Sequence, residues 1–248
     1  DYTFTSHIPS NEYGGHLVYY DDQGLVADPA SRTGESAADT KYRVAFMGDS
    51  FTEARQVSWA NSFVGLLSVA GADSATVKNY GVSGYSPIFY AVQYGSEVEP
   101  FRPTLVVCLL YSNDIYDDET TAEIAQWSES GRPLAIPGPR DTRWRTLLRK
   151  SYLMRLVRRV QLTLAWENWV LVEENRDISP LSDHLMRTPV DDVERSGSDF
   201  VLMVVPSRER LTEPPNEPAG PQFSDKWKQW AEENRVSFID LVGVFEEA

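Results

Sequence analysis

The sequence predicts an α/β protein whose strands form a mostly parallel, doubly wound sheet. The stretch "TLVVCLLY" at 104–111 is continuously apolar, as expected of a central strand that is covered on both faces. Residues 200–205, "FVLMVV", have the same character. Segments with a helical spacing of apolar residues alternate with the strands along the chain. This alternation is typical of a parallel sheet flanked by helices.

Three further strands and three helices follow from local patterns. The strands are expected at residues 42–47, 75–82 and 236–241, and the helices at 60–69, 88–98 and 223–234. In the first helix Phe63, Leu66 and Leu67 have helical spacing, and Gly71 provides a stop signal. Prolines close the second helix, and a proline-rich loop precedes the third.

The chain is expected to form a single domain, 1–248, with two additions to the sheet. Residues 1–41 are polar and weakly periodic, so we expect an extended arm with one candidate strand at 16–20. Residues 116–199 do not follow the alternation of strands and helices. We interpret them as an insertion or lid, helical in part.

The composition argues against several classes of function. A formal net charge of −14 and a pI of about 4.6 argue against nucleic-acid binding. No apolar run has the length of a membrane-spanning helix. The acidic stretches have neither EF-hand nor P-loop spacing, so we expect no metal and no cofactor. The single cysteine, Cys108, lies in an apolar run and is expected to be buried, and it permits no internal disulfide.

A basic stretch, residues 143–159, stands out in this acidic chain. Trp144, Leu147 and Leu148 can share one face of a helix, with arginines elsewhere on it. The preferred interpretation is a helix docked on the domain, with arginines that pair with the protein's own carboxylates. A helix on a membrane surface and a patch for an anionic polymer are the two alternatives.

Three polar clusters directly follow three of the predicted strands. They are Gly-Asp-Ser at 48–50, Gly-Val-Ser-Gly at 81–84 and Ser-Asn-Asp at 112–114. Ligand sites of open α/β sheets form at the carboxyl ends of the strands, so these clusters are expected to meet in one crevice. Taken singly, each has a plain structural interpretation, since a serine after a strand often caps a helix and Asn-Asp often makes a turn.

Together the three clusters supply the parts of an acyl-transfer site. Ser50 would attack a carbonyl carbon. The backbone N–H groups of Ser50 and Gly84 and the side-chain amide of Asn113 would stabilise the charge that develops on the carbonyl oxygen. Gly84 suits this role because a residue without Cβ lets the backbone approach a ligand closely. The pattern is not the G-x-S-x-G elbow of the α/β-hydrolases, because Thr52 stands where the second glycine should be.

The stretches "FMGDSFTEA", "NYGVSGYSP" and "LLYSND" resemble the first three sequence blocks of the SGNH/GDSL hydrolase family. The resemblance extends through "VLMVVPSRE" and "FIDL" and covers most of residues 42–241. It implies a flavodoxin-like three-layer α/β/α sandwich with a five-stranded parallel sheet in the order 2-1-3-4-5. It also implies that Ser50 is the nucleophile and that Gly84 and Asn113 complete the oxyanion hole.

The chain departs from the family pattern at two places. The third block usually carries a glycine two residues before the asparagine, where this chain has Tyr111. The family's base is a histidine in an Asp-x-x-His block after the last strand, whereas His7, His16 and His184 all lack an aspartate three residues earlier. We expect these three to be surface histidines, and the base to lie in a segment that follows Ala248.

The resemblance predicts a serine esterase that acts on small acyl esters, acetyl esters above all, with a carbohydrate as the alcohol part. An O-acetyltransferase of a cell-surface polysaccharide is one alternative, because both enzymes pass through the same acyl-enzyme. A catalytically silent binding module of the same fold is another. Relatives with this organisation often carry an N-terminal membrane anchor, so we expect an extracytoplasmic domain with no nucleic-acid partner.

Overall fold

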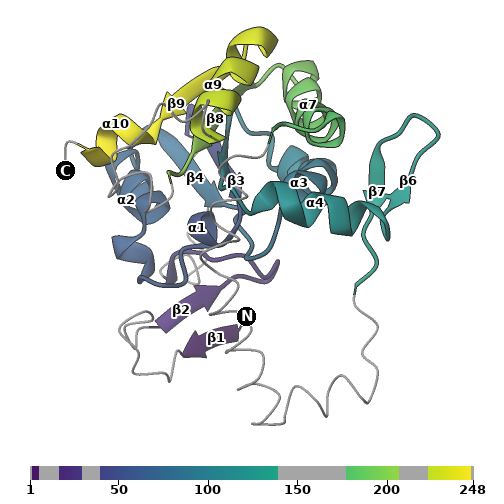
Figure 1. The fold of residues 1–248 in the computed structure, drawn as a ribbon. Coiled ribbons are helices and arrows are strands. Elements are labelled where there is room, and N and C mark those ends of the chain that lie inside the picture. The colour runs from purple at the N-terminus through teal and green to yellow at the C-terminus, as the bar shows by residue number, and fades with distance from the viewer. Residues whose placement is uncertain (1, 6–16, 30–39, 139–176, 207–222, 247–248) are drawn as a thin grey trace, which may run out of the picture.

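A computed structural model describes residues 2–5, 17–29, 40–138, 177–206 and 223–246 (Figure 1). Its elements, in chain order, are β1 Tyr2–Thr5, β2 Leu17–Tyr20, β3 Tyr42–Gly48, α1 Ser50–Glu53, η2 Trp59–Asn61, α2 Phe63–Ala70, β4 Ala75–Asn79, α3 Pro87–Gln93, η3 Tyr94–Val98, η4 Glu99–Phe101, β5 Leu105–Leu110, α4 Asp114–Ala122, β6 Gln126–Trp127, β7 Pro133–Ala135, α7 Pro180–Arg195, β8 Asp199–Val204, α9 Phe223–Asn234, β9 Ser237–Asp240 and α10 Leu241–Glu246. The basic stretch 143–159, His7 and His16 lie outside the described residues, so their interpretations stay predictions.

Five parallel strands form the central sheet in the order β4-β3-β5-β8-β9. Numbered by their appearance among these five, this is the order 2-1-3-4-5, and the predicted sheet is confirmed. β3 lies between β4 and β5, with Phe46 opposite Asn79 on one side and Met47 opposite Cys108 on the other. The loops that follow β4 and β5 therefore flank the loop that follows β3.

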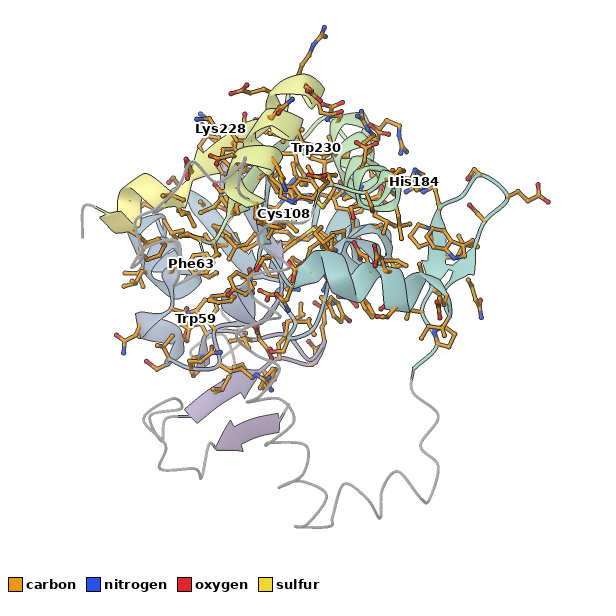
Figure 2. All side chains as sticks on the ribbon, in the orientation of Figure 1. Trp59, Phe63, Cys108, His184, Lys228 and Trp230 are labelled. Atoms are coloured by element: carbon orange, nitrogen blue, oxygen red, sulfur yellow. The ribbon has the colours of Figure 1, made fainter. Side chains whose placement is uncertain are left out.

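Two apolar layers cover the two faces of the sheet. On one face, α3, α7 and α9 contribute Tyr90, Met186 and Trp227, which belong to one core cluster with Met47, Cys108 and Leu202 of the strands. On the other face, Val64 of α2 packs with Phe46 and Val107. Cys108 is buried as predicted, with an exposed fraction of 1%, and Figure 2 labels it in the interior of the molecule. Helices on both faces give the three-layer sandwich that the sequence predicts.

The strands and helices differ from the predicted ones in three informative ways. β4 ends at Asn79 rather than at residue 82, although the Tyr80 and Val82 N–H groups still donate to the Phe46 and Gly48 carbonyls of β3. β8 is fully covered on one face only, since Val201 and Met203 are half-buried. On α2 the buried residues are Val64 and Gly65, whereas the apolar residues next along the helix are more than 45% exposed.

The region 116–199 contributes an unpredicted element of the sandwich. Its last part is α7, a 16-residue helix between β5 and β8 that packs against α3. Pro189 lies inside this helix, and a proline within a helical pattern is ordinarily taken as a break. The described remainder of the region holds most of α4 and a β6–β7 hairpin that projects from the body of the molecule (Figure 1).

The arm before the sheet is anchored to the domain. β2 is the strand considered at 16–20, and it pairs in antiparallel fashion with β1. Val18, Tyr20 and Val26 are buried together against Trp59 of η2. The Tyr20 hydroxyl also donates a hydrogen bond of 2.8 Å to the buried carboxylate of Glu53 in α1. The arm therefore reaches the segment that carries Ser50.

Candidate active site

The three predicted clusters lie at the carboxyl ends of β3, β4 and β5, at one edge of the sheet. Ser50 begins α1 directly after β3. Gly84 lies in the loop between β4 and α3, and Asn113 lies in the turn between β5 and α4. Because β3 is the middle strand of the three, the loops of Gly84 and Asn113 stand on either side of Ser50. This is the topological requirement of the predicted site.

Gly48 makes the sharp turn that presents Ser50. Its φ of +155° is unfavourable for other residues, and a Cβ there would lie 2.1 Å from Thr52 Oγ1 and 2.9 Å from the Leu109 carbonyl oxygen. Asp49 then caps α1, since its side chain accepts a 2.9 Å hydrogen bond from the Phe51 N–H. The Ser50 hydroxyl donates to the other oxygen of Asp49 at 3.3 Å.

The loop after β4 packs directly on the Ser50 turn. The Val82 N–H donates to the Gly48 carbonyl at 3.0 Å, and Asn79 donates to the Thr52 carbonyl at 2.7 Å. Gly81 has no room for a side chain, because a Cβ would lie 2.4 Å from the Glu53 backbone nitrogen. Gly84, farther along the loop, is exposed with a φ of +80°. Its backbone is therefore accessible to a ligand.

Glu53 joins the arm, the Ser50 turn and the β4 loop. The residue is 6% exposed, and its carboxylate accepts hydrogen bonds from the Tyr20 hydroxyl at 2.8 Å, from the Ser83 N–H at 2.9 Å and from the Ser83 hydroxyl. Arg55 lies 3.2 Å from the same carboxylate and also donates to Ser83. No local pattern indicates this role of Glu53, because Tyr20 and Ser83 lie 33 and 30 residues away along the chain.

The loop after β5 orients Asn113. The amide oxygen of Asn113 is enclosed and has no hydrogen-bond donor among the described residues, while the residue as a whole is half-exposed. Asp114 turns back on this loop and accepts a 3.1 Å hydrogen bond from the Tyr111 N–H, and its own N–H donates to the Tyr111 carbonyl at 3.1 Å. This reciprocal pair closes the turn around Asn113.

Two buried carboxyl groups lie beneath the Ser50 turn. Burial raises the pKa of the Asp49 carboxyl. Burial, together with the nearby charge of Asp49, raises the pKa of Asp114 well above its usual range. Burial first, and the Asp114 charge second, raise the pKa of the Tyr90 hydroxyl well above its usual range. Burial at this position therefore disfavours the simultaneous ionisation of both carboxyl groups.

His184 is the only histidine in the described part of the chain, and its ring serves a contact with the β6–β7 hairpin. Its Nε2 lies 2.7 Å from the Gly131 carbonyl oxygen, and the residue is half-buried (Figure 2). The adjacent Asp183 binds Trp230 Nε1 at 2.7 Å and Arg187 Nε at 2.8 Å instead. The structure therefore does not assemble Ser50, His184 and Asp183 as a triad.

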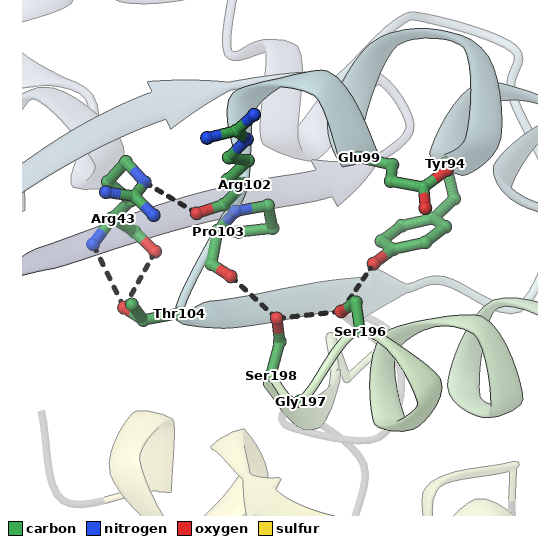
Figure 3. A pocket seen from close by; sticks show the side chains of 9 residues that line it. All are labelled: Arg43, Tyr94, Glu99, Arg102, Pro103, Thr104, Ser196, Gly197 and Ser198. Carbon is green, nitrogen blue, oxygen red and sulfur yellow. Dashed lines mark hydrogen bonds between the residues drawn. The ribbon is translucent and has the colours of Figure 1, made fainter.

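A pocket of about 470 Å³ opens at the opposite, amino-terminal edge of the sheet (Figure 3). It is lined by residues that precede strands, such as Thr104 and Ser198. A chain of hydrogen bonds runs along its wall from Tyr94 through Ser196 and Ser198 to the Pro103 carbonyl, at 3.2, 2.9 and 2.6 Å. These bonds hold the turns before β5 and β8 together. The pocket is separate from the edge that carries Ser50.

Two further classes of site are not found in the described ranges. No group of three histidine, cysteine or acidic side chains gathers there with the geometry to hold a metal ion. Nor does any helix in these ranges have both the length and the apolar character needed to cross a membrane.

A family comparison identifies the scaffold on which this edge is built. Residues 46–248 match the GDSL-like lipase/acylhydrolase family. The chain belongs to this family. The match begins in β3 and includes all three clusters at the carboxyl edge. No curated protein matches the sequence.

Solved structures with similar folds include three acylhydrolases or esterases. A catalytic mutant of Axe2, an acetylxylan esterase from Geobacillus stearothermophilus, is 17% identical, with 86% of this chain and 81% of that chain covered and a TM-score of 0.48. The acetyl xylan esterase AlAXEase is 14% identical, with 83% and 80% covered and a TM-score of 0.47. A putative acylhydrolase from Bacteroides fragilis is 16% identical, with 87% and 76% covered and a TM-score of 0.44.

Replacement of Gly81 tests the close packing of the β4 loop on the Ser50 turn. Gly81→Ala is expected to lower the free energy of unfolding by about 1–3 kcal/mol, because the new Cβ meets backbone rather than a movable side chain. Gly95→Ala is the control, since no atom lies within 4 Å of a Cβ at that helical position. Urea denaturation measures both, and equal stabilities would contradict the close packing.

The Glu53 carboxylate is tested by an isosteric change. Glu53→Gln replaces one carboxylate oxygen with an NH2 group that cannot accept the hydrogen bonds from Tyr20 or from Ser83, so we expect a loss of about 1.5–3 kcal/mol in the free energy of unfolding. Glu232→Gln, at an exposed position of α9, is expected to leave stability within about 0.5 kcal/mol of the wild type. Thermal and urea denaturation of the two variants provide the comparison.

Proposed function

We propose that the protein is a serine esterase that cleaves small acyl esters, with acetyl as the preferred acyl group. The observation that carries this proposal is the placement of Ser50 on a sharp turn between the loops of Gly84 and Asn113. This is the arrangement that a nucleophile and its oxyanion donors require, and it stands on a scaffold of the GDSL-like acylhydrolase family.

The proposed reaction runs through an acyl-enzyme. Ser50 Oγ bonds to the acyl carbon while its proton passes to a base, and the alcohol part of the ester leaves with a proton. Water then releases the acid and restores the hydroxyl. In the structure Ser50 Oγ is held by Asp49 at 3.3 Å, which orients the hydroxyl at the start of α1.

The acceptor distinguishes this esterase from its alternatives. An O-acetyltransferase of a polysaccharide would form the same acyl-enzyme and pass the acyl group to a sugar hydroxyl instead of water. A silent binding module would keep the crevice without turnover. An extracytoplasmic location, with an N-terminal membrane anchor, remains part of the proposal for either enzyme.

An aromatic pair, of which one ring is exposed, supports a carbohydrate as the alcohol part. Phe51, the residue after the proposed nucleophile, is 44% exposed, and its ring lies 4.7 Å from that of Tyr111 in the loop after β5. Tyr111 occupies the place where the family pattern has glycine. Flat aromatic rings stack on the C–H faces of pyranose rings, and this pair adjoins the residue that would be acylated.

Labelling with a fluorophosphonate probe tests the nucleophile. Ser50→Ala is expected to abolish labelling and aryl acetate hydrolysis and to leave the melting temperature nearly unchanged, because the hydroxyl is half-exposed. The control is His184→Ala, which should still be labelled because His184 binds the hairpin. Undiminished labelling of Ser50→Ala would contradict the proposal, and loss of labelling in His184→Ala would make His184 the base.

The aromatic pair is tested by comparing two substrates. Phe51→Ala is expected to raise KM for an acetylated oligosaccharide about tenfold, because ring stacking is lost, and to change kcat/KM for a small aryl acetate much less. Phe63→Ala on α2, at a site remote from the loops, controls for general loss of stability. Equal effects of Phe51→Ala on both substrates would contradict a sugar-binding role for the pair.

A further inference from the structure

Tyr90 of α3 contacts both of the loops that flank Ser50. Its hydroxyl lies 3.1 Å from Asp114 Oδ2 and 3.3 Å from the Tyr85 carbonyl oxygen. Asp114 follows Asn113 directly, and Tyr85 follows Gly84 directly. Tyr90 and Asp114 are both fully buried. A single side chain of α3 thus connects the residues that directly follow the two proposed oxyanion donors.

The number of protons available at this contact limits which oxygen atoms can act as hydrogen-bond donors. A tyrosine hydroxyl has one proton, and it faces two oxygen atoms. Asp114 Oδ2 also receives the Tyr111 N–H at 3.1 Å, whereas Oδ1 is buried with no hydrogen-bond partner among the described residues. If Asp114 Oδ2 carries a proton, every contact has a donor and an acceptor. In this arrangement the Tyr111 N–H donates to Asp114 Oδ2, the Asp114 O–H donates to the Tyr90 hydroxyl oxygen, and the Tyr90 O–H donates to the Tyr85 carbonyl.

The surroundings of Asp114 favour this neutral form. Asp49 on the Ser50 turn and Asp118 on α4 are acidic groups that act on it, and no described basic side chain pairs with it. Cys108 of β5 and Tyr90 of α3 are further titratable groups on which its charge acts. Its pKa is raised above the usual range by burial first and by the Asp49 charge second. A carboxylic acid that burial keeps neutral can donate a hydrogen bond at neutral pH.

We propose that Tyr90 and neutral Asp114 form a hydrogen-bonded clamp that sets the separation of the Gly84 and Asn113 loops. Both are positioning residues, since neither reaches the reacting atoms. The role in catalysis rests on the proposed esterase function, whereas the clamp itself is a property of the fold. Small errors in the placement of catalytic groups are costly, because a displacement of about 1 Å can lower a rate ~10²-fold.

Removal of one hydroxyl tests the clamp. Tyr90→Phe is expected to lower kcat for an aryl acetate at least about tenfold with little change in KM, because oxyanion stabilisation acts in the transition state. Tyr94→Phe is the matched control: Tyr94 is equally buried and one turn along the same helical segment, and its hydroxyl binds Ser196 at 3.2 Å near the opposite edge. Equal kcat values for the two variants would overturn the proposal.

Two measurements do not depend on turnover. In the NMR spectrum, Tyr90→Phe should shift the Gly84 backbone amide and the Asn113 side-chain amide, and Tyr94→Phe should shift neither. In the infrared spectrum, the C=O band of a neutral carboxylic acid should be present at neutral pH and absent from Asp114→Asn. A missing band or unshifted amides would overturn the clamp. Shifted amides in a chain without Ser50-dependent turnover would support the clamp and refute the esterase.

Discussion

Close backbone contact between the Ser50 turn and the β4 loop is the constraint on which the site depends. Gly48 and Gly81 have no space for a Cβ, and the atoms that exclude one belong largely to residues 52–53 and 109. The contact brings the loop after β4 into hydrogen bonding with the turn after β3. Glu53 then extends the same network to the arm through Tyr20. The position of Ser50 is therefore fixed by backbone packing as well as by the Asp49 cap of α1.

The two edges of the sheet differ in the polar groups that they carry. The amino edge holds a polar pocket whose hydroxyl groups are used in joining turns, as the Ser198 bond to the Pro103 carbonyl shows. The carboxyl edge instead keeps an exposed Gly84 backbone and a half-exposed Ser50 above buried polar groups. The pocket of about 470 Å³ and the three clusters therefore lie at different edges of the sheet. Strand topology and residue chemistry select the edge with Ser50.

Local signals predicted the strands and the three clusters at their ends, whereas the order of the strands in the sheet was implied by the resemblance to the SGNH/GDSL family. Apolar runs mark strands, and polar residues at their ends mark the loops. Helix α7 was not predicted, since Pro189 interrupts its pattern and the packing that stabilises it comes from α3. The roles of Glu53 and Tyr90 were also missed. Their partners are 30 and 24 residues away, and no local pattern reports such contacts.

The buried carboxyl groups create an electrostatic problem that a neutral Asp114 removes. An oxyanion that forms between the Gly84 and Asn113 loops would be repelled by any ionised acid below it. Two unit charges about 6 Å apart at an effective dielectric constant of about 20 interact by about 3 kcal/mol, which corresponds to a rate factor of ~10². Asp49 is needed to cap α1 and hold Ser50. A second ionised carboxylate would only oppose the reaction, whereas a neutral Asp114 supplies the hydrogen bond to Tyr90 without adding that charge.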